Sequence, residues 1–234
     1  MRRVAALAAK DLAVLWTSPL PYVGGAVFHA LLGLLYVSQL ETRQQALIQP
    51  LFPVAGFLLV VVVPVLTMRA FADETKAGSL DLLVAAGVPT PVLVIAKWLA
   101  AWITALAILA PSLLFVVLLH LYGNPEPGPI IAGYLGVVLL TAILTAVGVL
   151  ASASTTAAPV AATATLFVAM VLWFVHIGND SIVVNATVTR FSLSERMRSF
   201  AGGGIDTGDL TFFVLGTVAA VALTAVVLRA RRLR

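Results

Sequence analysis

Apolar residues fill six long runs of this chain, separated by short polar stretches. The runs lie at about 21–40, 51–70, 92–121, 130–151, 157–177 and 209–229. Each is close to the roughly 20 residues that a helix needs to cross the hydrocarbon core of a bilayer. The Leu, Val and Ala blocks lack the alternation of a membrane β-barrel, and backbone inside lipid must satisfy its own hydrogen bonds. The pattern therefore predicts an all-α integral membrane protein with six transmembrane helices, organised as a single domain over residues 1–234.

Residues 1–18 have a different, amphipathic pattern. On a helix, three cations share one sector while apolar side chains gather on another, which predicts an N-terminal helix lying in the membrane interface. The cations are Arg2, Arg3 and Lys10. Asp11 falls on the wrong side of this pattern. A cleaved signal peptide is the alternative, but the charged Lys10-Asp11 pair and the break at 17–19 precede the first long apolar run, which argues against it.

A polar segment, residues 71–90, separates the second and third apolar runs. Charged residues come first, and an apolar set follows at the i, i+3, i+4 spacing of one helical face, which predicts a short amphipathic helix. The charged residues are Asp73, Glu74, Lys76 and Asp81, and the apolar set is Leu80, Leu83 and Val84. Gly87, Pro89 and Pro91 are expected to end this helix.

The second long polar segment, residues 178–208, contains the sequence Ser192-Leu-Ser-Glu195. Serine followed three residues later by glutamate is a capping box, so a short helix is expected from there through Phe200. The three glycines at 202–204 are expected to end it with a flexible joint.

Composition agrees with a membrane protein, because the chain is 61% hydrophobic and only 10% charged, against roughly 25% charged in soluble domains. The net charge of +4 does not indicate nucleic-acid binding, since the cations lie beside apolar runs, where they set topology. No cysteine is present, which excludes disulfides, thiolate metal sites and a cysteine nucleophile.

The distribution of Lys and Arg predicts the orientation. With the N-terminus in the cytoplasm, ten of these residues lie on the cytoplasmic side and four on the other side, which favours two cytoplasmic termini. The ten are Arg2, Arg3, Lys10, Arg69, Lys76, Lys97, Arg229, Arg231, Arg232 and Arg234; the four are Arg43, Arg190, Arg196 and Arg198. Residues 71–90 are then cytoplasmic, and residues 178–208 form an outer loop.

Little catalytic or ion-carrying chemistry is present. No Asp, Glu, Lys or Arg falls in the middle of an expected span, whereas ion-coupled carriers usually place one there. His29, in the first expected span, is the one titratable exception besides tyrosines, and we interpret it as a packing or hydrogen-bonding residue. His120 and His176 are too few for a convincing metal site. The chain lacks a phosphate loop, a zinc-protease motif and a nucleophile elbow, so we expect no catalytic residue and no bound metal or cofactor.

Several stretches resemble ABC-2 type permeases, the membrane subunits of type-2 (type V fold) ABC exporters. In that family the segment between the second and third spans reads roughly E-x-x-x-G-[ST]-L-[ED]-x-L, then a proline, then Gly/Ala-Lys. The matching residues here are 68–74, 78–83, Pro89 and Ala96-Lys97. Residues 133–136, 148–152 and 200–213 are similar to the small six-span subgroup of gliding-motility and copper-maturation permeases. Ala77-Gly78-Ser79 departs mildly from the family, which often has a bulkier polar residue and Thr.

The resemblance implies that the chain is a permease dimerising in the cytoplasmic membrane and binding two copies of a separately encoded ATPase, which carries ATP and Mg. Residues 71–90 would be a coupling helix, and 192–204 would lie on the outer face. The implied ATPase-contacting residues are Glu74, Gly78, Ser79, Leu80, Asp81 and Leu83. A dimer of identical or of different permeases is equally compatible.

The expected activity is outward movement of a lipid, amphiphile, peptide or cofactor-like cargo, driven by the partner ATPase. Two alternatives stay open. One is a haem-export permease of cytochrome maturation, which the second half of the chain matches less well. The other is a membrane scaffold that transmits ATPase motion to an outer assembly factor without transporting anything itself.

Overall fold

The computed structural model describes residues 2–43, 47–80, 87–122, 125–175 and 191–231, and these residues contain helices and no strand. In chain order the main helices are α1 (Arg2–Thr17), α2 (Leu20–Arg43), α3 (Leu51–Thr67), α4 (Ala72–Lys76), α6 (Thr90–Leu109), α7 (Leu113–Tyr122), α8 (Pro127–Ser154), α9 (Ala158–Phe174), α11 (Leu193–Ala201) and α12 (Thr207–Arg231). The expectation of an all-α chain is therefore confirmed over the described residues.

Five helical stretches are long and apolar enough to cross a membrane, by length and composition: Leu20–Ser38, Leu51–Lys76, Thr90–Leu121, Pro127–Ser154 and Thr207–Arg231. They correspond to five of the six expected spans, so the chain has the character of a multi-pass membrane protein. The remaining expected span, 157–177, contains α9, an apolar helix of 17 residues. That is at the short end of the length that crosses a bilayer.

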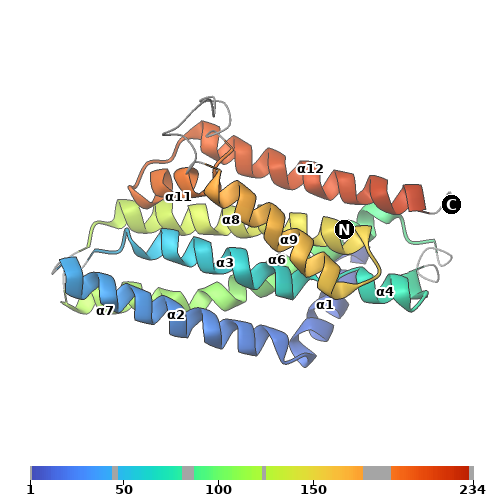
Figure 1. The fold of residues 1–234 in the computed structure, drawn as a ribbon, viewed down its shortest axis with the longest axis horizontal. Coiled ribbons are helices and arrows are strands. Elements are labelled where there is room, and N and C mark those ends of the chain that lie inside the picture. Colours follow the sequence, from blue (N-terminus) through green and yellow to red (C-terminus); the bar gives the residue numbers. More distant parts are fainter. Residues whose placement is uncertain (1, 44–46, 81–86, 123–124, 176–190, 232–234) are drawn as a thin grey trace.

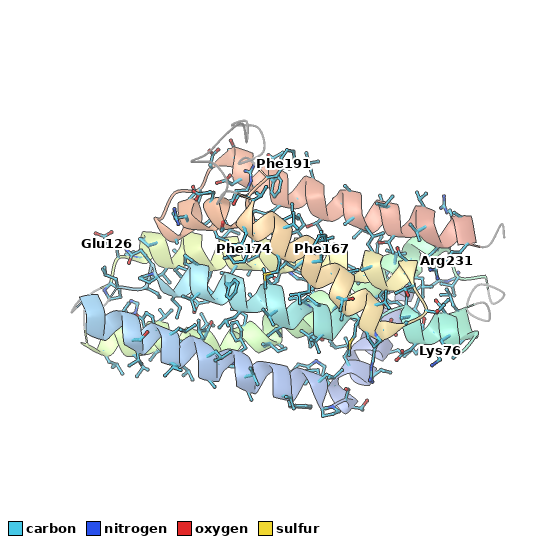
Figure 2. The ribbon with its side chains drawn as sticks, viewed as in Figure 1. Lys76, Glu126, Phe167, Phe174, Phe191 and Arg231 are labelled. Carbon is cyan, nitrogen blue, oxygen red and sulfur yellow. The ribbon has the colours of Figure 1, made fainter. Side chains whose placement is uncertain are left out.

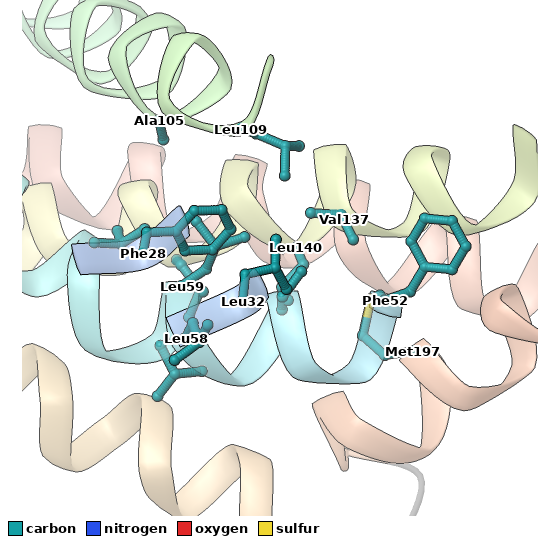
Figure 3. Close-up of a cluster of buried hydrophobic side chains, with 14 of the residues drawn as sticks. Phe28, Leu32, Phe52, Leu58, Leu59, Ala105, Leu109, Val137, Leu140 and Met197 are labelled. Atoms are coloured by element: carbon teal, nitrogen blue, oxygen red, sulfur yellow. The ribbon is translucent and has the colours of Figure 1, made fainter. Parts of the chain in front are cut away.

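Helix α8 is the central element of the bundle. It packs against α3, α6, α9, α11 and α12, most of which run along the long axis of the molecule (Figure 1). The apolar core around it includes Phe52, Leu140 and Met197, which are almost completely buried (Figure 3). Many large apolar side chains point outward instead, such as Phe167 of α9, which is 70% exposed (Figure 2). Such a surface suits lipid rather than water.

Gly133, Gly136 and Gly148 of α8 permit close helix contacts. An added Cβ would lie 2.2 Å from the ring of Phe52 at the first position and 2.7 Å from Phe200 at the second. At Gly148 it would lie 2.0 Å from the Thr67 hydroxyl. Because packed interiors leave no space for an extra carbon, these glycines set how closely α3 and α11 approach α8.

A short 3₁₀ segment, η1 (Ala110–Ser112), interrupts the third apolar stretch. Proline at position 111 cannot donate a backbone hydrogen bond to the preceding turn, which accounts for the change of helix type. Beyond it α7 turns toward α2, where the rings of Tyr36 and Phe115 pack edge to face 5.4 Å apart. The helix is thus interrupted at Pro111.

The two ends of the bundle carry different short elements (Figure 1). At one end lie α4 and the C-terminal end of α12; at the other lies α11. The predicted capping box of α11 is confirmed on its serine side, since Ser192 Oγ accepts a hydrogen bond from the Glu195 backbone N–H at 3.3 Å. Arg196 of this helix pairs with Asp209 and lies 4.1 Å from the centre of the Phe212 ring, which fixes α11 against the start of α12.

Candidate coupling site

The polar segment between α3 and α6 begins with a helix of only five residues, α4. Gly78 follows with φ +70°, a left-handed conformation that glycine adopts without steric cost. Ser79 and Leu80 are helical again. The charged residues 73–76 and the apolar set that begins at Leu80 therefore do not share one continuous helix, because the left-handed Gly78 separates α4 from Ser79. Leu83 and Val84 of the expected amphipathic helix lie outside the described residues. Gly87, with φ +75°, lies just before Pro89 and the start of α6, where the sequence placed the end of the segment.

The start of α4 is fastened to α8 by one serine. Ser152 Oγ accepts hydrogen bonds from the backbone N–H groups of Phe71 at 2.9 Å and Ala72 at 3.1 Å. The same hydroxyl donates to the carbonyl of Met68 at 2.9 Å. A helix of this length leaves its first N–H groups without helical partners. Here the hydroxyl of Ser152, from a helix distant in the sequence, is the acceptor for these N–H groups in place of a local N-cap.

Four charged side chains meet beside α4, and we call them the charged cluster: Lys10 and Asp11 of α1, Glu74 of α4 and Lys97 of α6. Lys97 Nζ lies 2.8 Å from Glu74 Oε1 and 3.5 Å from Asp11 Oδ2. Lys10 Nζ lies 3.9 Å from a carboxylate oxygen of each. The cluster therefore joins three elements that are far apart in the chain.

The central ion of this cluster is buried. The Lys97 side chain is 6% exposed, those of Asp11 and Glu74 are 13% and 19% exposed, and that of Lys10 is 55% exposed. The Lys97 ammonium also lies 5.2 Å from the centre of the Phe71 ring, a distance at which a cation interacts with an aromatic face. Breaking such a buried pair leaves an uncompensated charge, which is much more costly than losing a surface pair.

Burial raises the pKa of the Asp11 carboxyl above its ordinary value, because desolvation penalises the ionised form. Lys97 opposes this rise most strongly, Glu74 adds to it as a neighbouring negative charge, and Lys10 opposes it. Glu74 Oε2 is buried and has no hydrogen-bond partner among the residues that the structure describes. The cluster thus holds two carboxylates around one buried ammonium.

A cavity of about 230 Å³ opens beside the charged cluster, between α1, α6 and the end of α3. Arg69 and Asp73 lie on its wall and form an exposed pair with Arg69 Nε 3.9 Å from Asp73 Oδ2. Within the described residues no group of three or more His, Asp or Glu side chains is arranged to hold a metal ion. His29 and His120 each engage a carbonyl of their own helix, at 2.9 Å, and His176 lies outside the described residues.

The residues expected to contact an ATPase are placed differently from one another. The Glu74 carboxylate turns inward to Lys97, whereas Gly78 is exposed. Ser79 is half-buried and its hydroxyl donates to the Glu74 carbonyl at 3.4 Å. Leu80 packs against a small apolar cluster containing Phe71. Asp81 and Leu83 lie outside the described residues, so the ATPase contact stays a prediction.

Three residues of this site had no structural role in the sequence-based prediction: Asp11, Lys97 and Ser152. For Asp11 a signal existed, because its carboxylate fell on the wrong side of the amphipathic pattern of residues 1–18, and the structure gives the reason in its pairing with Lys97. The sequence-based prediction used Lys97 only as one of the cations that set the orientation and as part of the family motif. Nothing in the sequence marks Ser152 as the partner of the residues that begin α4.

Comparison with known proteins adds no identification. No protein-family model matches this chain, and no curated protein matches it.

Proposed function

We propose that this chain is the membrane permease subunit of an ATP-driven exporter of the ABC-2 type, with ATP hydrolysis carried out by a separate ATPase subunit. In this proposal six helices span the cytoplasmic membrane, α9 being the fifth, and both termini are cytoplasmic. Two permeases form a dimer that binds two ATPase copies, and ATP and Mg belong to the partner. The cargo is a lipid, amphiphile, peptide or cofactor-like molecule.

The single observation that carries the proposal is the charged cluster. A motor outside the membrane can move the spans only if the segment it contacts is rigidly joined to them. The bond between Glu74 and Lys97 joins α4 to α6, and Asp11 joins α1 to the same lysine. Ser152 joins the start of α4 to α8. A displacement of α4 would therefore be passed on to three helices.

The exposed part of the same segment supplies a surface for the ATPase. Asp73, Lys76, Ala77 and Gly78 are exposed beside the inward-facing Glu74. We assign the ATPase contact to this exposed turn together with Ser79 and Leu80. Glu74 then acts as a positioning residue, holding the turn against α6 from inside. This arrangement fits the motif resemblance at 68–83 without requiring Glu74 to touch the partner.

The test is reconstitution of the chain with its ATPase in proteoliposomes. The Gly78→Pro variant cannot keep the φ of +70°, because proline fixes φ near −65°. Glu74→Ala removes the bond to Lys97. Both variants are expected to lower permease-dependent ATP turnover severalfold while still inserting in the membrane and purifying as a single species. Glu126→Gln, at the opposite end of the bundle (Figure 2), is the matched control and should leave turnover unchanged.

Unchanged turnover in both coupling variants would refute the proposed coupling role of this segment. Cargo movement is measured in the same vesicles with a fluorescent lipid and with a labelled peptide. ATP-dependent movement of either supports an exporter. ATP turnover that depends on the permease but never moves cargo would instead favour the scaffold function.

A further inference from the structure

An apolar groove of about 520 Å³ runs between α6 and α12, on the outside of the bundle. Its wall on α6 includes Val94, Ile95 and Trp98, and its wall on α12 includes Val221 and Ala222. Arg229 lies at the end of the groove nearest the C-terminal end of α12, beside Pro91 at the start of α6. The groove is thus apolar along its length and cationic at one end.

Hydrogen bonds to α8 hold the Trp98 side of the groove in place. Trp98 Nε1 donates to the Ala142 carbonyl at 3.1 Å. The Trp98 ring stacks on that of Trp102, with 5.3 Å between the ring centroids and an interplanar angle of 10°. Trp102 Nε1 in turn donates to the Val138 carbonyl at 3.2 Å. Both indole rings are held against α8, so the shape of the groove beside Trp98 is set before any ligand binds.

The length of the groove matches one leaflet of a bilayer. From Thr217 to Arg229 a helix rises about 18 Å at 1.5 Å per residue. Half of a hydrocarbon core is about 15 Å thick. An occupant that reaches from the Arg229 end to the level of Thr217 would therefore extend from a membrane surface to about the midplane.

No carboxylate among the described residues lies within ion-pair distance of Arg229. The Arg229 guanidinium can form paired hydrogen bonds with a phosphate. Basic residues at the cytoplasmic end of membrane helices attract anionic lipid headgroups.

We propose that this groove is a binding site for one anionic glycerophospholipid, with an acyl chain between α6 and α12 and the headgroup phosphate on Arg229. A void lined by apolar side chains loses dispersion contacts and does not hold water well, so a hydrocarbon chain is the occupant that suits it. The phosphate neutralises Arg229. The site does not depend on the proposed ATPase, since both of its walls belong to this chain.

The test uses native mass spectrometry of the delipidated protein in detergent, with phosphatidylglycerol as the probe and phosphatidylcholine as the zwitterionic comparison. The wild-type protein is expected to retain one phosphatidylglycerol in preference to phosphatidylcholine. Arg229→Gln should weaken phosphatidylglycerol binding about fivefold and abolish the preference. Ala222→Trp, which fills the groove, should remove binding of both lipids. Glycerol 3-phosphate, which carries a phosphate but no acyl chain, should not bind.

Two variants on α12 serve as controls. Arg231→Gln removes a cation two residues away that does not line the groove, and Leu223→Trp adds bulk at a side chain that is 50% exposed and outside it. Both should bind as the wild type does. If Ala222→Trp does not purify as a single species, Val226→Trp, also on the groove wall, replaces it.

The assignment would be overturned if the wild type retained the two lipids equally, if Arg229→Gln kept the preference for phosphatidylglycerol, or if a groove-filling variant still retained lipid. It would also be overturned if the wild type formed a dimer without lipid and a groove-filling variant were a monomer, because the occupant would then be a second copy of this chain.

Discussion

Lys97 is the side chain on which the charged cluster depends. It is the least exposed of the four, and it is the only one whose ammonium lies within 3.5 Å of both carboxylates. Lys10 is further from both, at 3.9 Å, and is more than half exposed. Removing Lys97 would therefore leave Asp11 and Glu74 as neighbouring, largely buried negative charges, whereas removing Lys10 would not.

Lys97→Ala is expected to destabilise the folded protein by about 3–5 kcal/mol, the usual cost of leaving a buried charge without its partner. Thermal unfolding of the purified protein in detergent measures the loss. Arg69→Ala is the control, because its pair with Asp73 is 57% exposed on both sides and such pairs contribute no more than about 1 kcal/mol. Similar losses in the two variants would contradict the central position of Lys97.

Asp11 should make stability depend on pH, because its pKa is raised by burial from the ordinary value of 3.8. A carboxyl whose pKa is higher in the folded protein binds more protons when folded. Its contribution is fully present below 3.8 and is lost as the pH rises through the folded pKa. Asp11→Asn should therefore gain stability relative to the wild type as the pH rises through that range.

The measurement is the difference in melting temperature between Asp11→Asn and the wild type, followed from about pH 3.5 upward. Lys97, Glu74 and Lys10 face the same carboxyl, and they are present in both proteins. A difference that stays constant over the whole range would show that burial does not shift this carboxyl.

At the scale of elements, the described part of the segment between α3 and α6 consists of short pieces held by their neighbours. Helix α4 has five residues, far too few to be stable alone in water. Its order must come from the packing of Phe71, from the Glu74–Lys97 bond and from Ser152 of α8. The sequence predicts a short amphipathic helix in residues 71–90. In the described part of that segment the structure has the five-residue α4, a break at Gly78 and a helical Ser79-Leu80.

Ser152→Ala should release the start of α4 from α8. The substitution leaves two buried backbone N–H groups without an acceptor, which costs about 1–3 kcal/mol for each unsatisfied group. We expect faster amide hydrogen exchange over residues 69–77, measured by mass spectrometry. Ser154→Ala is the control, since that exposed hydroxyl donates within its own helix, to the Leu150 carbonyl. Equal exchange in wild type and Ser152→Ala would mean that the cap does not hold α4.

Long apolar runs made the main helices predictable. The expected runs 51–70, 130–151 and 209–229 correspond to α3, α8 and α12 within a few residues, because twenty apolar residues in sequence permit little besides a buried or membrane helix. The contacts between helices were less predictable. A residue such as Ser152 acts through partners 80 positions away, and neither periodicity nor composition carries that information.

Charged side chains mark both ends of the whole molecule. Lys76 and Arg231 lie at the end that holds α4 and the C-terminal end of α12, and Glu126 lies at the opposite end (Figure 2). The charged cluster is also at the α4 end. The orientation predicted from the sequence assigns the α4 end to the cytoplasm and the α11 end to the outer side.

The orientation can be tested with single cysteines, because the chain contains none of its own. Lys76 and Glu126 are both exposed, so neither substitution disturbs packing. With a membrane-impermeant maleimide, Glu126→Cys should label in intact cells, and Lys76→Cys should label only after the membrane is permeabilised. Labelling of Lys76→Cys in intact cells would put α4 out of reach of a cytoplasmic ATPase. The proposed function would then be wrong, but the lipid groove would remain, because it requires only a bilayer and Arg229.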